Sequence, residues 1–211
     1  MHRSPYVRPM TRPTLLIALA ALAGCGSSDS SAQAKPARTE TAVFAGGCFW
    51  CTEADFEKLS GVVSAVSGYT GGRVANPSYE RVSAGGTGHY EAVRIVYDPA
   101  RIGYPQLVRH YFRTVDPTDS GGQFCDRGES YRTAIFALNP AQWEAANAER
   151  GRVNRLLKGK VVTPVLAASR FYPAEGYHQD YYKRNSVRYR YYRYRCGRDA
   201  RLAKIWGATP K

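Results

Sequence analysis

Two cysteines three positions apart are the side chains in this sequence best suited to chemistry. Cys48 and Cys51 enclose two aromatic residues and directly follow the glycines Gly46 and Gly47. The pattern predicts a short apolar strand, a turn at the two glycines and a helix whose first turn contains Cys48. The Cys48 sulfur then lies beside backbone N–H groups that have no partner within the helix. Because the helix dipole favours an anion there, we expect Cys48 to react as a thiolate. Cys51 lies one turn further into the helix, where the dipole stabilises a thiolate less.

The same spacing fits three other kinds of site. A C-x-x-C pair after an apolar strand is typical of thioredoxin-like disulfide oxidoreductases. It also has the spacing of zinc ligands, but the chain lacks a second closely spaced ligand pair, so no metal and no cofactor is expected. Cys125 and Cys196 would allow two structural disulfides in an exported binding protein without enzymatic activity.

A carboxyl group that could act as an acid lies further along the chain. Residues 90–97 alternate as a strand does, so Glu91 shares a face with Val93, Ile95 and Tyr97. If that face points inward, burial raises the pKa of Glu91 and the carboxyl group holds a proton near neutral pH. The alternative is an ionised carboxylate at an exposed strand end.

The elements that must position these side chains are both strands and helices. They do not alternate strictly, so the pattern predicts a two-layer α/β (α+β) sandwich with a mixed sheet. Pro164 favours an edge position for the last strand. We expect strands over 41–45, 62–66, 90–97, 131–138 and 161–167, helices over 48–59, 105–115 and 140–157, and loops over 67–77 and 116–128.

The N-terminus is typical of an export signal. A basic lead precedes the nine-residue apolar run 15–23, which is too short to span a bilayer, and Leu22-Ala23-Gly24-Cys25 resembles a bacterial lipoprotein cleavage box. An ordinary cleaved signal or a buried helix remains the alternative. We expect an extracytoplasmic lipoprotein of the cell envelope or periplasm, lipid-anchored to a membrane through Cys25, with a signal peptide at 1–24, a Ser/Ala/Gly-rich tether at 25–40 and a catalytic domain at 41–211.

Six ordered blocks of sequence together resemble the peptide methionine sulfoxide reductase A family. The resemblance extends over residues 43–182 and implies a ferredoxin-like core and reduction of methionine sulfoxide, free or in proteins, in its S form. The blocks are Gly47-Cys48-Phe49-Trp50, 67–72, 76–79, Thr87-Gly88-His89-Tyr90-Glu91-Ala92-Val93 with 97–99, Asp126-Arg127-Gly128 with Tyr131-Arg132, and 174–179.

The resemblance also implies a role for each matching residue. Cys48 is the nucleophile and Glu91 the proton donor, while Phe49 and Trp50 form an apolar pocket for the S-methyl group of the substrate. Tyr79 and Tyr131 donate their hydroxyl groups to the sulfoxide oxygen, and Asp126 lies in an active-site block. Taken alone, most of these residues would be assigned to packing or to turns.

The product on the enzyme would be a sulfenic acid at Cys48, which a second thiol converts to a disulfide that a thioredoxin-like reductant then reduces. Family members place this resolving cysteine in a C-terminal segment, so Cys196 is the first choice, Cys51 the second and Cys125 the third. Cys51 stands where glycine is frequent in the family, and Cys125 where asparagine is frequent.

The C-terminal segment is basic and aromatic, with nine Lys or Arg and one acid between Lys183 and Lys204. Such a segment could bind nucleic acid or anionic lipid headgroups. Export argues against nucleic acid. We favour a solvated segment that packs its tyrosine rings on the domain.

Overall fold

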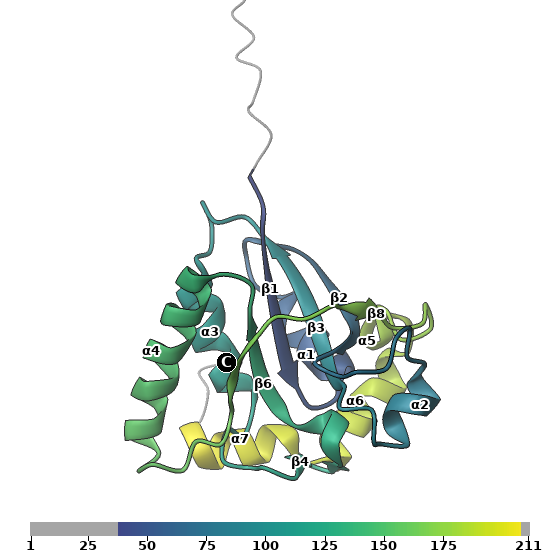
Figure 1. The fold of residues 1–211 in the computed structure, drawn as a ribbon. Coiled ribbons are helices and arrows are strands. Elements are labelled where there is room, and N and C mark those ends of the chain that lie inside the picture. Colours follow the sequence, from purple (N-terminus) through teal and green to yellow (C-terminus); the bar gives the residue numbers. More distant parts are fainter. Residues whose placement is uncertain (1–37, 208–211) are drawn as a thin grey trace, which may run out of the picture. The chain divides into compact units, whose positions relative to one another are not determined.

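The computed structural model describes residues 38–207, and Figure 1 shows their fold. Eight strands and eight helical segments alternate irregularly along this range. The strands are β1 Glu40–Gly46, β2 Val62–Thr70, β3 Tyr90–Tyr97, β4 Gly122–Gln123, β5 Asp126–Arg127, β6 Thr133–Ala137, β7 Val165–Ala167 and β8 Tyr172–Pro173. The helices are α1 Phe49–Phe56, α2 Tyr79–Ser83, α3 Tyr104–Thr114, the 3-10 turn η1 Glu129–Tyr131, α4 Pro140–Leu156, α5 Tyr181–Arg184, α6 Ser186–Arg195 and α7 Arg198–Trp206.

A six-stranded mixed sheet in the order β7-β6-β1-β3-β2-β8 forms the centre of the domain. Only the β6–β7 pair is parallel. The predicted mixed sheet and two-layer sandwich are therefore confirmed, with β7 at an edge, as Pro164 indicated. Because β1 and β3 are antiparallel neighbours, the end of β1 and the start of β3 lie at the same end of the sheet. This register brings the glycines before Cys48 next to Glu91.

One face of the sheet packs against helices. Phe44 of β1 is fully buried and stacks on Phe56 of α1 and Tyr111 of α3, with ring centroids 5.1 Å apart in each pair. Val93 and Ile95 of β3 belong to the same cluster. Helix α1 is thus held against the sheet along its length, which fixes the residues at its first turn.

The opposite face is covered by an extended segment rather than by helices. Residues 168–171 leave β7 at one edge and cross the sheet to β8 at the other edge, as Figure 1 shows. Phe171 packs on the second apolar cluster, and the Thr70 hydroxyl donates to the Arg170 carbonyl oxygen at 3.0 Å. The same contacts explain one wrong prediction. The expected loop 67–77 is strand up to Thr70, because β2 pairs with β3 on one side and β8 on the other.

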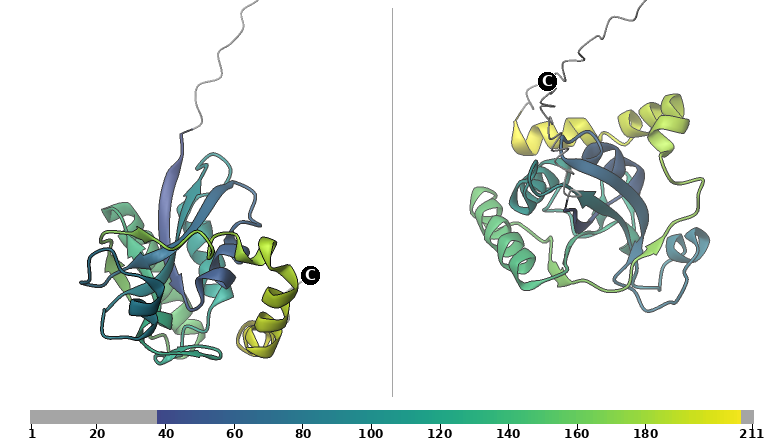
Figure 2. Two further views of the ribbon diagram at one scale, coloured as in Figure 1. Left: turned by 90° about the vertical axis from the view of Figure 1, so that its right-hand side faces the viewer. Right: turned by 90° about the horizontal axis from the view of Figure 1, so that it is seen from above.

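The C-terminal segment forms three helices that the sequence analysis did not predict. Tyr189 of α6 is buried, and Tyr181 stacks on Trp50 with ring centroids 3.7 Å apart. The expectation that this segment packs tyrosine rings on the domain is confirmed. Figure 2 shows α6 and α7 together on one side of the domain.

Three predictions concern residues outside the described range: the signal peptide at 1–24, the lipid at Cys25 and most of the tether at 25–40. Within residues 38–207, no helix combines the length and the apolar character needed to span a bilayer.

Candidate active site

Cys48 caps the N-terminus of α1 and is 5% exposed. Gly47 before it has φ +79°, and a Cβ there would lie 2.5 Å from Cβ of Gln123, so the turn into the helix requires glycine. The Cys48 carbonyl oxygen accepts the first helical hydrogen bond, from the N–H of Thr52 at 3.3 Å. The predicted strand–glycine–glycine–cysteine turn is therefore present.

The Glu91 carboxylate accepts a hydrogen bond from the backbone N–H of Phe49, at 3.0 Å. Glu91 is 3% exposed and shares the buried face of β3 with Val93, Ile95 and Tyr97. Burial raises its pKa to about 8, against the opposing effect of the Phe49 hydrogen bond. The carboxyl group is thus held at the first turn of α1 and is mostly protonated near neutral pH, as the strand pattern predicted.

The two thiols of the C-x-x-C pair are both free and buried, and their pKa values shift in opposite directions. Burial, the neighbouring Cys51 and the charge of Glu91 raise the pKa of Cys48 well above its ordinary value. A hydrogen bond from Cys48, and then the charges of Arg198 and Arg193, lower the pKa of Cys51 to about 7 despite burial. The pKa of Cys48 is therefore shifted in the direction opposite to the one that the dipole argument predicted, because burial outweighs the effect of the helix start, where the Phe49 N–H binds Glu91.

The two predicted tyrosines face the same carboxyl group. Tyr79 begins α2 and Tyr131 ends η1, and each hydroxyl group affects the pKa of the other. Burial, and then the charge of Glu91, raise both tyrosine pKa values. Both hydroxyl groups therefore remain protonated and can donate to an oxygen placed beside Glu91.

Asp126 lies in the short β4–β5 hairpin and accepts a hydrogen bond from the Tyr192 hydroxyl at 2.5 Å. Burial raises its pKa, although the bond from Tyr192 opposes the change. The hairpin occupies part of the predicted loop 116–128. Asp126 thus connects the active-site hairpin to α6, a contact that the sequence analysis missed.

His178 organises the aromatic residues of the site. Nε1 of Trp50 donates to Nδ1 of His178 at 3.0 Å, so the neutral ring carries its hydrogen on Nε2. The His178 ring lies 4.9 Å from the Phe49 ring and 4.6 Å from the Tyr79 ring, centroid to centroid. Sequence reasoning gave His178 no role, although it lies in the 174–179 block whose family resemblance could have marked it.

The other two cysteines within residues 38–207, Cys125 and Cys196, form a disulfide. Cys196, the first choice for resolution, is therefore not a free thiol in this structure. The free thiol beside Cys48 is Cys51. Cys125 is exposed and Cys196 is half-buried, so this disulfide faces solvent while the inner pair does not.

Two arginines of the C-terminal helices pack beneath α1. Arg193 forms hydrogen bonds with Asp55 at 2.9 and 3.1 Å. Arg198 is 2% exposed, and its Nη2 donates to the Thr114 carbonyl oxygen at 2.7 Å and to that of Gly46 at 3.3 Å. These contacts bring positive charge to Cys51. Nothing in the local sequence indicates them, because the partners are more than 80 residues away.

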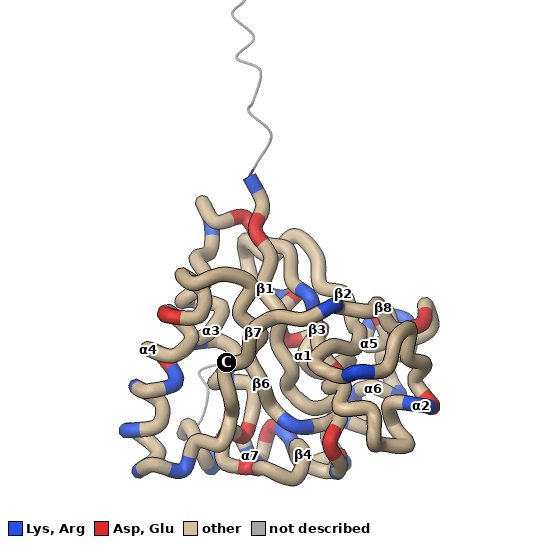
Figure 3. The backbone as a smooth tube through the Cα atoms, in the orientation of Figure 1, with Lys and Arg blue, Asp and Glu red and all other residues tan. Residues whose placement is uncertain are grey.

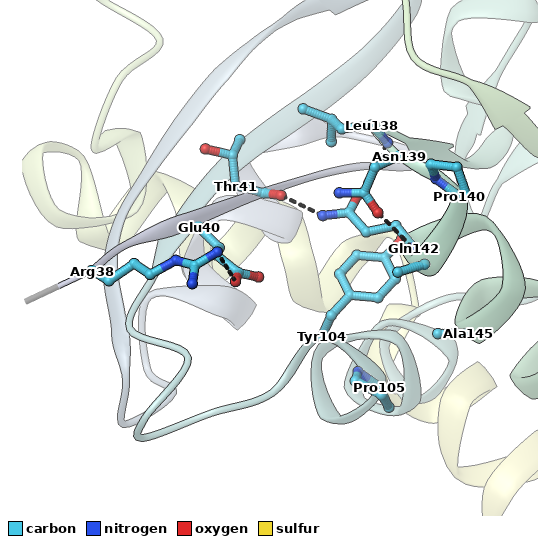
Figure 4. A pocket seen from close by; sticks show the side chains of 11 residues that line it. Arg38, Glu40, Thr41, Tyr104, Pro105, Leu138, Asn139, Pro140, Gln142 and Ala145 are labelled. Atoms are coloured by element: carbon cyan, nitrogen blue, oxygen red, sulfur yellow. Dashed lines mark hydrogen bonds and ion pairs between the residues drawn. The ribbon is translucent and has the colours of Figure 1, made fainter.

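A cavity of about 700 Å³ lies away from these residues, at the start of β1, and Figure 4 shows its lining. Among its lining residues, Gln142 donates to the Thr41 carbonyl oxygen at 2.7 Å, and Arg38 pairs with Glu40 at 3.9 Å. None of the predicted site residues lines it. The cavity is therefore separate from the thiol site.

Comparisons with known proteins agree with this geometry. A family model described as peptide methionine sulfoxide reductase matches residues 40–210. The Peptide methionine sulfoxide reductase MsrA 2 of Caulobacter vibrioides is 52% identical over 197 residues, which are 93% of this chain and 99% of that protein.

Solved structures show the same fold. Mxr1 from Saccharomyces cerevisiae in reduced form has a TM-score of 0.68 and 31% identity, covering 72% of this chain and 88% of that one. Methionine sulfoxide reductase A of Corynebacterium diphtheriae has a TM-score of 0.65 and 32% identity, covering 73% and 78%. Mxr1 in complex with Trx2 is similar in fold alone, with a TM-score of 0.50 and 22% identity, covering 70% and 87%.

The raised pKa of Glu91 predicts a pH-dependent stability. The folded pKa is about 8 and the ordinary value is 4.5, so between these values the folded chain keeps a proton that the unfolded chain has lost. The free energy of unfolding should therefore fall as pH rises through this window, and Glu91→Gln should remove that part of the fall. Urea unfolding across the window measures it, with the exposed Glu144→Gln as control. Parallel pH curves for wild type and Glu91→Gln would contradict the assignment.

Proposed function

Because the chain belongs to the peptide methionine sulfoxide reductase A family and is a thiol-dependent methionine sulfoxide reductase, we propose that Cys48 attacks the sulfoxide sulfur while Glu91 protonates its oxygen. The observation that carries this assignment is the contact at the start of α1. The Glu91 carboxylate binds the N–H of the residue that follows Cys48, at 3.0 Å. A nucleophile and a protonated acid are thus held at one helix end.

The proposed first step transfers the sulfoxide oxygen from the substrate to the Cys48 sulfur. The Cys48 sulfur attacks the substrate sulfur as its proton passes to the Cys51 thiolate, and the sulfoxide oxygen takes a proton from Glu91. The protonated oxygen then moves to Cys48, which leaves a sulfenic acid on the enzyme and releases methionine. The substrate sulfur is reduced by two electrons, and the Cys48 sulfur is oxidised by two.

The residues around this pair would orient the substrate. The hydroxyl groups of Tyr79 and Tyr131 would donate to the sulfoxide oxygen, and Phe49 and Trp50 would enclose the S-methyl group. Preference for the S form of methionine sulfoxide, free or within proteins, is proposed from the family. His178 fixes the Trp50 ring through its 3.0 Å hydrogen bond and so supports this pocket.

For the second step we propose that Cys51, rather than Cys196, resolves the sulfenic acid. Cys51 is the free thiol beside Cys48, and its pKa is lowered to about 7. The proton that Cys51 took up in the first step would pass to the Glu91 carboxylate. The Cys51 thiolate would then attack the Cys48 sulfur and displace hydroxide, which leaves as water with that proton. The product is a Cys48–Cys51 disulfide.

The Cys125–Cys196 pair would then carry electrons to the inner disulfide. Once reduced by an external dithiol, its thiols would exchange with the Cys48–Cys51 disulfide and return both inner cysteines to thiols. A thioredoxin-like protein is the proposed reductant. The complex of the yeast relative Mxr1 with Trx2 supports this class of partner.

We also propose an extracytoplasmic location with a lipid anchor at Cys25. The support is the basic lead, the apolar run 15–23 and the Leu22-Ala23-Gly24-Cys25 box. Membrane attachment would then come from the lipid and not from a spanning helix.

Removing the nucleophile or the acid should have different effects. In assays of the purified protein on both sulfoxide epimers with a dithiol reductant, Cys48→Ser should abolish methionine formation, because no other thiol would occupy its place. Glu91→Gln should lower the rate by about a hundredfold or more, since general acid catalysis contributes at least that factor. Full activity in Cys48→Ser would overturn the assignment.

Removing Cys51 should separate sulfoxide reduction from recycling. Cys51→Ser should still convert about one equivalent of sulfoxide in a single turnover, but turnover with the protein reductant should fall steeply because the sulfenic acid persists. A C-x-x-C disulfide oxidoreductase would instead lose its activity entirely. Mass spectrometry of Cys196→Ser after one turnover should still find a Cys48–Cys51 disulfide. Its absence would return the resolving role to Cys196.

The lipid anchor is testable in cells. A labelled fatty acid should be incorporated into the wild-type chain and into Cys48→Ser, but not into Cys25→Ser, because lipoprotein modification uses the cysteine at the cleavage site. Labelling that does not depend on Cys25 would refute the anchor.

A further inference from the structure

The outer face of α6 exposes large apolar side chains on one side of the helix. Val187, Tyr191 and Tyr194 are 72%, 65% and 81% exposed, and their i, i+4, i+7 spacing places them on one stripe. The opposite side of the helix faces the domain through Tyr189, which is buried. Solvent exposure of three such side chains on a single short helix is unusual for a surface that has no partner.

Positive charge borders this stripe on both sides. Arg190 lies on one side and Arg188 and Arg195 on the other, and all three are exposed. Within residues 38–207 none of the three has a carboxylate within 4.0 Å, whereas Arg193 on the inner side pairs with Asp55. Figure 3 shows basic positions at α6. We call this surface the α6 outer face, defined as Val187, Arg188, Arg190, Tyr191, Tyr194 and Arg195.

The α6 outer face leads directly to the solvent-facing disulfide. Cys196 follows the last residue of α6 as its C-cap, and Tyr194 and Arg195 immediately precede it. On its other side Cys196 borders a cavity of about 500 Å³ that Phe124 and Arg201 also line. The acids of this cavity already have partners, since Asp116 binds Arg201 and Asp119 binds Arg127. A protein that binds at the disulfide therefore lies next to the C-terminal end of α6, where Tyr194 and Arg195 of this face are located.

We propose that the α6 outer face is the docking surface for the dithiol protein that reduces the Cys125–Cys196 disulfide. This inference rests on the proposed function. The matching partner surface is an apolar patch around a reactive cysteine, bordered by aspartate and glutamate. An anionic membrane offers the same charge, but a membrane seated on α6 would cover the end of the helix where the disulfide must stay open to the reductant.

The electron transfer at this surface balances without a further reactant. A thiolate of the partner attacks the exposed sulfur of Cys125, the Cys125–Cys196 bond breaks, and Cys196 leaves as a thiolate that takes up a proton. The second thiol of the partner then attacks the mixed disulfide and releases Cys125 as a thiol. The partner leaves oxidised by two electrons, and the outer pair is reduced by two.

The test compares a protein reductant with a small one on the full-length chain. Activity is measured with bacterial thioredoxin, kept reduced by its NADPH-dependent reductase, and separately with dithiothreitol. Tyr191→Ala/Tyr194→Ala and Arg190→Glu/Arg195→Glu should each raise the KM for thioredoxin by about tenfold, as expected for a docking surface. Neither should change the rate with dithiothreitol, which needs no docking. Higher salt should raise the KM of the wild type and not that of the Arg190→Glu/Arg195→Glu variant.

Matched controls on α4 separate docking from general effects of lost aromatic area or charge. Trp143→Ala and Arg155→Glu alter exposed residues there and should leave both activities unchanged. An unchanged KM for thioredoxin in the α6 variants, or an equal loss with dithiothreitol, would overturn the proposal. So would loss of binding to phosphatidylglycerol vesicles with the KM preserved, which would assign the face to a membrane. Failure of the proposed function can be told apart from failure of the docking proposal. If the proposed function were wrong, the wild type would form no methionine with either reductant.

Discussion

The structure of the site depends on a carboxyl group that is buried beside a thiol. Glu91 is enclosed at the start of β3 and bound to the N–H of Phe49. Since a tenfold change in a protonation equilibrium is worth about 1.4 kcal/mol, a pKa of about 8 instead of 4.5 makes ionisation roughly 5 kcal/mol more costly here than in water. The fold meets this constraint by keeping the group neutral. A neutral carboxyl group is also the form that can donate a proton to the sulfoxide oxygen.

Burial also raises the pKa of the neighbouring thiol, Cys48. The charges of Glu91 and Asp126 add to the effect of burial on Cys48, while the charges of Arg198 and Arg193 from the C-terminal helices lower the pKa of Cys51. The arginines are themselves held, Arg193 by Asp55 and Arg198 by the carbonyl oxygens of Thr114 and Gly46. The C-terminal segment is therefore part of the active site. Its Arg198 and Arg193 lower the pKa of Cys51, and its Cys196 forms one half of the Cys125–Cys196 disulfide.

Much of this arrangement could be predicted from the sequence, because its determinants are local. The alternation of residues 90–97 placed Glu91 on the buried face of β3, and the glycines before Cys48 predicted the turn into α1. The family resemblance supplied Tyr79, Tyr131 and Asp126, which local patterns alone would have assigned to packing or turns. Helix α6 was missed because its sequence alternates tyrosine and arginine without a clear apolar period.

Long-range contacts set the limits of sequence reasoning. The pairing of Cys125 with Cys196 spans 71 residues, and the approach of Arg198 to Gly46 spans 152. The dipole argument favoured ionisation of Cys48 because it considered only α1. It could not include the Glu91 carboxylate that occupies the helix start, or the cations that lie beside Cys51. Local rules thus located the chemistry, and tertiary contacts determined the direction in which the pKa of each thiol is shifted.

The most direct test of the account is the pH dependence of the chemical step itself. Methionine formed in a single turnover by the fully reduced protein would be followed by rapid quench from pH 6 to pH 10, without any recycling reductant. If a neutral Glu91 protonates the sulfoxide oxygen, the rate should fall as pH rises through about 8, because the acid loses its proton there. A rate that keeps rising through that range would show that thiolate formation alone controls the reaction and would contradict the account.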